Sequence, residues 1–277
     1  MGILNLTPDS FSDGGLWNDP PRAVEHALRL LDEGADLLDL GAESTRPGGG
    51  VYGAGAAIVP PEEENARLLP VLAAVRRATD APLSVDTRKG EVARRALAAG
   101  ADLINDVSAL GDPELGRAVA EAGCPLVLMH SRGDLATMQR EIRFTDLLGE
   151  VRSELAAAVE RAVALGIAAE QLVLDPGLGF GKTAEQNLAL LARLDELSGL
   201  GRPLLVGASR KSFLGRALET SGRPGAGPRE RLPGSLAAVA WAAARSAAVV
   251  RVHEVAETVQ FLAVWRAIAS ERVEGAA

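Results

Sequence analysis

Three stretches of the sequence share one pattern: EGADLLDLG (33–41), AGADLINDV (99–107) and AGCPLVLMH (122–130). In each of them a helical stretch ends at a glycine, and a short apolar run follows. A glycine at that place is typical of a helix C-cap, and a short apolar run is typical of a buried parallel strand. The pattern therefore predicts repeated helix-to-strand units of an α/β protein.

The same pattern recurs along the whole chain and predicts eight strand–helix units. The strands are expected at 2–5, 37–41, 83–86, 103–106, 126–130, 172–175, 204–207 and 249–252. The helices are expected near 20–34, 61–79, 90–99, 113–122, 146–165, 184–197, 211–219, 229–246 and 254–270. Short connections between the units favour a single (β/α)8 TIM barrel over residues 1–277, with the active site at the C-terminal ends of the strands.

A doubly wound sheet is the main competitor of the barrel. Such a sheet commonly has fewer strands and a glycine-rich GxGxxG first turn, which LNLTPDSFSDGG (4–15) does not match. The chain length of 277 residues also fits the roughly 250 that a TIM barrel typically has. The sequence therefore favours one closed barrel domain.

Composition narrows the classes of partner. The net charge is −8 and the isoelectric point is near 5.1, which argues against a general affinity for nucleic acid or for an anionic membrane. No apolar run approaches the roughly 20 residues that a membrane span needs.

Cys124 is the one cysteine, so no intrachain disulfide can form and a reducing, cytoplasmic location is expected. Met1 leads directly into GILNLTPDS, so no signal peptide is expected.

Polar residues stand at the end of every predicted strand, where a barrel enzyme places its active site. They are Asn5, Glu43 to Arg46, Asp86, Asn105 with Asp106, His130, Asp175, Ser209 to Lys211, and Arg251 with His253. A polar residue after an apolar strand costs free energy unless it is paired. One such residue is readily explained as a cap, but eight strand ends together predict a functional site.

The residue types suit a flat heterocycle and an anion. Carboxylates, an amide and a lysine ammonium group match a ring with a 2-amino-4-oxo face, because each charge-assisted hydrogen bond contributes about 1.5–3 kcal/mol. Arginine and histidine side chains suit a phosphate group. Asn5 offers a neutral oxygen to Mg²⁺, which binds few protein ligands together with phosphate oxygens.

Other chemistries find no support in the motifs. DPGLGFGK (175–182) lacks the spacing of a nucleotide-binding phosphate loop, and its glycines are expected to let the backbone approach a ring. The sequence contains no HExxH or CxxC motif, so a zinc site is not expected. Gly207-Ala208-Ser209 is not a GxSxG nucleophile elbow.

Eight motifs, in order and across essentially the whole chain, resemble the dihydropteroate synthase family. They are MGILNLTPDSFSDGG (1–15), GAESTRPG (41–48), SVDTRK (84–89), INDVS (104–108), MHSRGDLATMQ (129–139), DPGLGFGK (175–182), GASRKSFLG (207–215) and RVHEV (251–255). The resemblance implies that 6-hydroxymethyl-7,8-dihydropterin diphosphate condenses with 4-aminobenzoate, with Mg²⁺ assisting. In that family the C–O bond is thought to break before the amine attacks.

The resemblance also implies roles for individual residues. The pterin pocket would be formed by Asp86, Asn105, Asp175, Lys211 and Arg251. The diphosphate would be held by Asn5, Arg46, Arg251 and His253, with Asn5 also binding Mg²⁺. The aminobenzoate subsite would be formed by Phe11, Thr45, Pro47, Lys211 and Ser212. The catalytic residues would be Asp86, Lys211, Arg251 and His253. A homodimer and inhibition by sulfonamides, which mimic 4-aminobenzoate, are further implications.

Two departures and two alternatives accompany the resemblance. The usual RVHDV motif reads RVHEV here because of Glu254, and relatives usually carry residues ahead of the first strand. One alternative is a pterin-binding barrel that transfers a methyl group from a methyl-folate to a corrinoid protein, but such a protein is not expected to combine ESTRPG with SRKSFLG. The other is a non-catalytic pterin-binding paralogue, which should have lost residues of the anion site.

Overall fold

The computed structural model describes residues 1–7, 19–44, 59–133, 138–140, 142–223 and 227–274. Its eight strands lie in chain order, and each pairs in parallel with the next. The strands are β1 (Gly2–Asn5), β2 (Leu38–Gly41), β3 (Leu83–Asp86), β4 (Leu103–Asp106), β5 (Leu126–Met129), β6 (Leu172–Asp175), β7 (Leu204–Val206) and β8 (Ala247–Val250).

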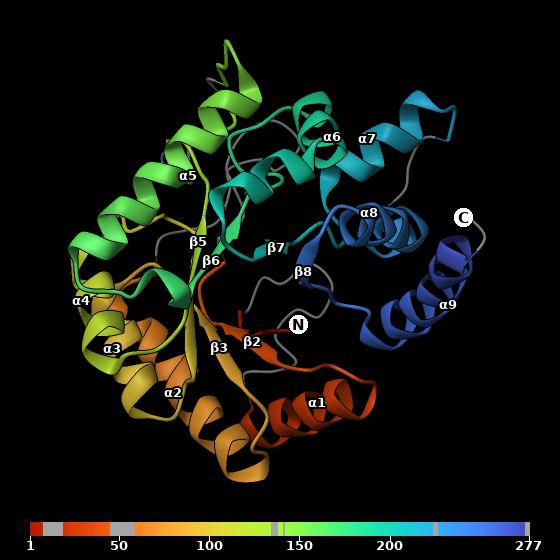
Figure 1. Cartoon of the computed structure of the whole chain (residues 1–277). Helices are drawn as coiled ribbons and strands as arrows, with labels where there is room; N and C mark the ends of the chain where they lie inside the picture. Colours follow the sequence, from red (N-terminus) through yellow and green to blue (C-terminus); the bar gives the residue numbers. More distant parts are fainter. Residues whose placement is uncertain (8–18, 45–58, 134–137, 141, 224–226, 275–277) are drawn as a thin grey trace.

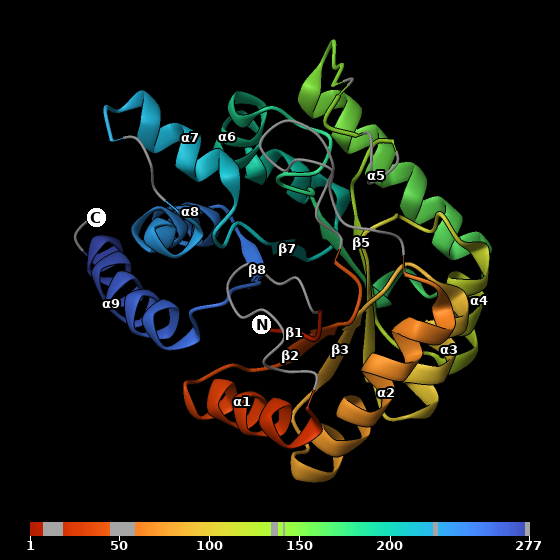
Figure 2. The same cartoon turned by 180° about the vertical axis from the view of Figure 1, so that it is seen from behind.

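The helices form an outer ring around the strands, as Figures 1 and 2 show. They are α1 (Pro20–Asp32), α2 (Pro61–Ala78), α3 (Gly90–Ala98), α4 (Pro113–Ala122), α5 (Leu147–Ala164), α6 (Ala184–Ala192), α7 (Ser212–Thr220), α8 (Leu232–Ala244) and α9 (Val255–Glu274). Short 3₁₀ turns lie at Ala169–Gln171, Leu194–Leu200 and Pro228–Arg231. The glycines Gly34, Gly100 and Gly123 follow α1, α3 and α4 with φ of +99°, +103° and +64°, as expected for helix ends.

Hydrogen bonds between the two ends of the sheet close it into a barrel. Gly2 forms a parallel bridge with Val252. Ile3 N donates to Val252 O, and Val252 N donates to Met1 O, each over 3.0 Å. The α-amino group of Met1 donates to Val250 O over 3.0 Å. The predicted (β/α)8 barrel is confirmed.

Alternation along the short strands separates two apolar layers. Side chains such as Leu38, Leu40 and Leu83 pack between the sheet and the helices in one large core. A smaller cluster around Met1, Val127 and Leu205 forms a second group that includes neighbours from β4, β6 and β8. The barrel is therefore a packed structure whose functional groups lie at the strand ends.

Several elements differ from the predicted bounds, and two of these differences have a cause in the backbone. β8 begins at Ala247, two residues earlier than expected, because Ser246 adopts a left-handed φ of +64° that ends the preceding helical stretch. The helix expected over 184–197 stops at Ala192 and is followed by the 3₁₀ turn Leu194–Leu200. Leu194 and Leu197 remain buried in that turn, so the apolar pattern is satisfied without a continuous α-helix.

Candidate active site

Arg251, directly after β8, pairs with carboxylates of two other strands, β2 and β3. Its Nε donates to Asp39 Oδ2 over 2.6 Å, and its Nη2 donates to Asp86 Oδ2 over 3.0 Å. Asn105 Nδ2 donates to the same Asp39 oxygen over 3.2 Å. The predicted residues Asp86, Asn105 and Arg251 therefore lie together although they are far apart in the sequence.

Asp39 is a member of this group that the sequence reasoning missed. It lies within β2 between Leu38 and Leu40, both of which pack in the core between sheet and helices. The alternation of a strand therefore directs Asp39 to the opposite face, toward the barrel interior, where it is fully buried. A single carboxylate inside an apolar run was the signal available in the sequence.

Two carboxylate oxygens of this group are left unpaired. Asp39 Oδ1 and Asp86 Oδ1 are buried and accept no hydrogen bond from the described residues. Burial raises the pKa of Asp86 against the opposing charge of Arg251, and the neighbouring Asp39 raises it further. A buried acceptor without a partner costs about 1–3 kcal/mol, so a ligand that offers N–H groups here recovers this free energy.

Asp175 ends β6 and faces Lys211. Its Oδ1 accepts a hydrogen bond from Gly177 N over 2.7 Å, which leaves Oδ2 without a hydrogen-bond partner among the described residues. Burial raises the pKa of Asp175, while the positive charge of Lys211 acts in the opposite direction. Asp175 therefore offers one carboxylate oxygen beside a lysine.

Lys211 is the N-cap residue of α7 and reaches back to the loop after β6. Its Nζ donates to Leu178 O and lies 4.7 Å from the ring centroid of Phe180. Burial lowers the pKa of Lys211 to about 8, although Asp175 favours the charged form. Phe180 packs with Val107, Met129 and Met138 in a small apolar cluster. A lysine over an aromatic ring, next to a carboxylate, suits a flat polar ring.

The DPGLGFGK loop (175–182) wraps around the ammonium group of Lys182. Lys182 Nζ donates to Gly177 O and Phe180 O over 3.0 Å each and lies 2.9 Å from His130 Nδ1. Gly177, Gly179 and Gly181 have φ of +67°, +86° and +60°. The glycines therefore serve left-handed turns around a buried lysine, a structural role that the sequence reasoning did not assign to Lys182.

Ionisable neighbours hold this loop against α5. His130 Nε2 lies 3.0 Å from a carboxylate oxygen of Glu154, which also pairs with Arg132. Burial lowers the pKa of His130 to about 4, and burial lowers the pKa of Lys182 to about 7. His130, predicted only as a strand-end residue, thus links Lys182 to α5.

A tight turn presents Ser209 and Lys211 on either side of Arg210. Arg210 has a left-handed φ of +60°, and α8 fixes its backbone, because Arg210 N donates to Ser235 Oγ over 3.0 Å. The Arg210 guanidinium pairs with Glu254. Ser209 Oγ lies 2.9 Å from His253 Nδ1. Burial and the positive charge of Arg210 lower the pKa of His253 well below its ordinary value.

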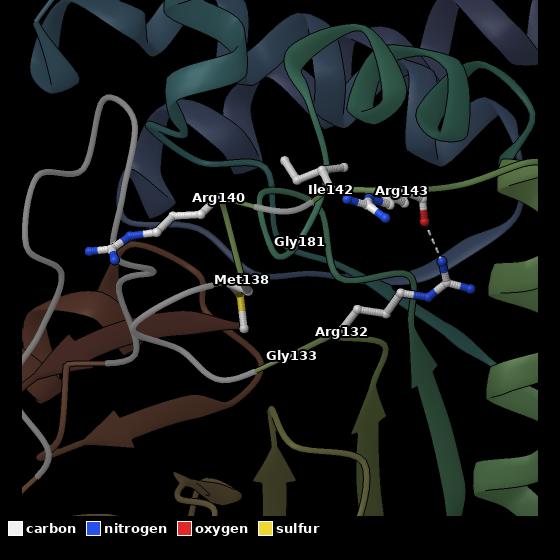
Figure 3. Close-up of a pocket in the computed structure, with 7 residues that line it drawn as sticks. All are labelled: Arg132, Gly133, Met138, Arg140, Ile142, Arg143 and Gly181. Atoms are coloured by element: carbon white, nitrogen blue, oxygen red, sulfur yellow. Dashed lines mark hydrogen bonds between the residues drawn. The ribbon is translucent and has the colours of Figure 1, made fainter.

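A pocket of about 500 Å³ lies beside these loops (Figure 3). Its lining includes three arginines, Arg132, Arg140 and Arg143, together with Gly181 of the β6 loop. Arg132 Nη1 donates to Arg143 O over 2.6 Å, which joins the two sides of the pocket. The surface next to the site therefore carries positive charge in a protein of net negative charge.

The remaining predicted residues divide into two groups. Asn5 ends β1 and is half-buried, with no side-chain hydrogen bond to a described residue, and Ser212 begins α7. Phe11, Thr45, Arg46 and Pro47 lie outside the described residues. Among the described residues, the Glu43 carboxylate accepts a hydrogen bond from Val59 N over 3.0 Å.

Comparison with known proteins identifies the family of the chain. A family model described as pterin-binding enzyme matches residues 1–253. The chain belongs to this family. It is 46% identical to a dihydropteroate synthase of Synechocystis, covering 96% of this chain and 90% of that protein.

Solved structures of dihydropteroate synthases resemble the chain over nearly its whole length. A Yersinia pestis enzyme in a sulfonamide complex has a TM-score of 0.90 at 44% identity, covering 98% of this chain and 94% of that one. A Xanthomonas albilineans enzyme with 4-aminobenzoic acid has a TM-score of 0.85 at 48% identity, covering 97% of this chain and 92% of that one.

Two features are absent from the described residues. None of their helices is long and apolar enough to cross a membrane. Among the same residues no cluster of three or more histidine, cysteine, aspartate or glutamate side chains is arranged to hold a metal ion.

Proposed function

We propose that the protein acts as a dihydropteroate synthase. It joins the pterin methylene carbon of 6-hydroxymethyl-7,8-dihydropterin diphosphate to the amine of 4-aminobenzoate and releases diphosphate. The observation that carries the proposal is the group formed by Asp86, Asn105, Asp175, Lys211 and Arg251, drawn from separate strand ends. The similarity to dihydropteroate synthases over nearly the whole chain supports the same reaction.

The pterin ring would bind between the carboxylates and Lys211. The unpaired Oδ1 of Asp86 and the Oδ2 of Asp175 are acceptors for the ring N–H and amino groups. Lys211 would donate to a ring acceptor, and the Phe180 ring beside it offers an apolar face. Each charge-assisted bond would contribute about 1.5–3 kcal/mol to binding.

The diphosphate would lie at the ends of β1 and β8. Arg251, His253 and the undescribed Arg46 would bind its oxygens, and they would stabilise the charge that develops as the C–O bond breaks. Asn5 fits a Mg²⁺ ion that arrives with the diphosphate, since its amide oxygen is free of described partners and Mg²⁺ needs few protein ligands. The ion would supply further charge neutralisation to the leaving group.

The amine substrate would enter last, against the first turn of α7. The first turn of α7 begins at Ser212, and the partial positive charge at a helix N-terminus suits the carboxylate of 4-aminobenzoate. Phe11, Thr45 and Pro47 would complete this subsite. No covalent enzyme nucleophile is needed, because the departing diphosphate leaves a carbon that the amine attacks directly. Exclusion of water from the site would protect that carbon from hydrolysis.

A homodimer through α8 and α9 belongs to the same proposal. The two helices pack against each other, and together they expose Trp241, Val264 and Ile268 to 46%, 57% and 59%. Large apolar side chains gathered on adjacent helices are typical of a protein interface. We place the enzyme in the cytoplasm, with which the buried, unpaired Cys124 is compatible.

The test is a coupled assay for diphosphate release with and without 4-aminobenzoate. Release that requires the amine, together with formation of 7,8-dihydropteroate, supports the proposal. Release in water alone would indicate a hydrolase. Pterin binding without any release would indicate a non-catalytic paralogue. A sulfonamide should inhibit in competition with 4-aminobenzoate, and noncompetitive inhibition would contradict a shared subsite.

A further inference from the structure

Ser209 makes three polar contacts around His253. Its Oγ lies 2.9 Å from His253 Nδ1, accepts a hydrogen bond from His253 N over 3.3 Å, and lies 3.3 Å from Glu254 Oε2. Ser209 itself is 8% exposed, so bulk water competes little for these contacts. The hydroxyl is thus shared between one ring nitrogen, one backbone N–H group and one carboxylate.

Counting donors selects one proton arrangement for these contacts. A hydroxyl has one proton to donate and two lone pairs that accept. The Glu254 carboxylate can only accept, so all three contacts are hydrogen bonds at the same time only if the Ser209 proton points to Glu254. Both lone pairs of Ser209 then accept, one from the backbone N–H of His253 and one from its ring. The ring nitrogen next to Ser209, Nδ1, must therefore carry the proton.

The other ring nitrogen is left with a lone pair. His253 Nε2 has no hydrogen-bond partner among the described residues, and the side chain is half-buried. Glu254 is held in place by its ion pair with Arg210, whose backbone is fixed in turn by Ser235. The Glu254 carboxylate is therefore a fixed acceptor for the Ser209 hydroxyl.

We propose that Ser209, backed by Glu254, is a positioning residue that holds His253 in the tautomer with its proton on Nδ1, so that Nε2 is the atom offered to the diphosphate. This inference rests on the proposed function. It also gives a role to the glutamate of RVHEV, whose longer side chain reaches back to Ser209.

A consequence is that diphosphate binding takes up one proton. Burial, and after it the neighbouring Arg210, Arg251, Lys211 and His26, lower the pKa of His253 well below its ordinary value, so the ring of the unliganded protein is neutral at pH 7. An arriving diphosphate brings negative charge, which favours the imidazolium form. The proton comes from solvent and binds at Nε2, and the new N–H group donates to a phosphate oxygen.

The first measurement is a long-range ¹H–¹⁵N spectrum of the unliganded protein, which contains three histidines. The signals that disappear in His253→Gln identify His253. The proposal expects a protonated Nδ1 and an unprotonated Nε2. A spectrum with the proton on Nε2 would overturn it. This readout needs no catalytic activity.

The second measurement is calorimetric binding of inorganic diphosphate with Mg²⁺, in buffers of different ionisation enthalpy. Ser209→Ala should bind diphosphate about tenfold more weakly, the effect of losing one well-placed hydrogen bond. Its His253 should lose the fixed Nδ1 proton, while the KM for 4-aminobenzoate stays near the wild-type value. Ser209→Thr keeps the hydroxyl and should retain the wild-type tautomer and most of the affinity.

Two further variants make the result decisive. Glu254→Gln keeps Ser209 but removes the fixed acceptor charge, so it should weaken diphosphate binding in the same direction even if Ser209→Ala folds poorly. Ser270→Ala removes an exposed hydroxyl on α9 and should behave as wild type.

Unchanged ¹⁵N shifts and unchanged diphosphate affinity in Ser209→Ala and Glu254→Gln would overturn the inference. A wild-type protein with the Nδ1 proton but without dihydropteroate formation would overturn the proposed function instead, and would leave the tautomer assignment supported.

Discussion

Asp175→Asn separates a binding role from a structural one at a single carboxylate. Asp175 Oδ1 accepts from Gly177 N over 2.7 Å, and an asparagine oxygen can keep that bond. The substitution changes the other atom, Oδ2, from an acceptor into an N–H₂ donor. The loop is therefore preserved, while the atom available to a ligand changes from acceptor to donor.

Binding and stability should respond in opposite directions. Loss of one charge-assisted bond to a pterin costs about 1.5–3 kcal/mol, which corresponds to a weakening of roughly 10- to 150-fold. Burial raises the pKa of Asp175, which means that the folded state disfavours the carboxylate relative to the unfolded chain. At neutral pH the carboxylate therefore lowers stability, and a neutral asparagine should leave the free energy of unfolding equal or higher.

The assay is calorimetric binding of 6-hydroxymethylpterin, paired with urea unfolding of the same samples. Asp146→Asn is the matched control, because Asp146 also accepts a backbone N–H, from Gly149, but lies at the exposed start of α5. It should bind the pterin as wild type does. Wild-type affinity in Asp175→Asn would remove Asp175 from the pocket, and a parallel loss of affinity and stability would show that its role is structural.

Three further changes test other parts of the site. Burial lowers the pKa of Lys211 to about 8, so its charged form is lost as pH rises through that value and kcat/KM should fall above pH 8. Lys211→Ala should lose most turnover and should not show this fall in kcat/KM, and an unchanged pH profile would contradict the role of Lys211. In urea unfolding, Gly177→Ala should lower the free energy of unfolding by more than about 2 kcal/mol, because φ is +67° and the new Cβ would lie 1.8 Å from His130 O. The control Gly123→Ala, with a φ of +64° and open space around its Cβ, should lower it by only about 1 kcal/mol. Ile268→Asp on α9 should shift a dimer to monomer in light scattering, and an unchanged mass would exclude this face from the interface.

The local pattern of apolar residues was sufficient to predict most strands of the barrel. Short apolar runs predicted β3, β4 and β6 with the bounds that the structure has, because the strands of a parallel barrel are buried on both faces. The start of β8 was missed, since it depends on the left-handed backbone of Ser246, which is not a residue that signals such a turn. Bounds that rest on an individual backbone conformation are not visible in apolar periodicity.

The candidate active site also contains residues that the local sequence pattern indicates and residues whose role depends on tertiary contacts. Residues at strand ends could be named from the sequence because the barrel brings those ends together. Asp39 lies inside a strand and becomes a site neighbour through Asn105 and through Arg251, which is 212 residues away. Lys182 likewise gains its role from three acceptors that meet only when the loop is folded. Such partnerships arise from tertiary contacts, which a single sequence does not display.

The join between the first and last strands has a consequence for how the enzyme assembles. Val252, which pairs with Met1, Gly2 and Ile3, stands between Arg251 and His253 in the sequence. Contacts across nearly the entire chain carry a high entropic cost and tend to form late in folding. The anion-binding end of the site would then be the last part to be completed, and an incompletely folded chain would be unable to capture the diphosphate substrate.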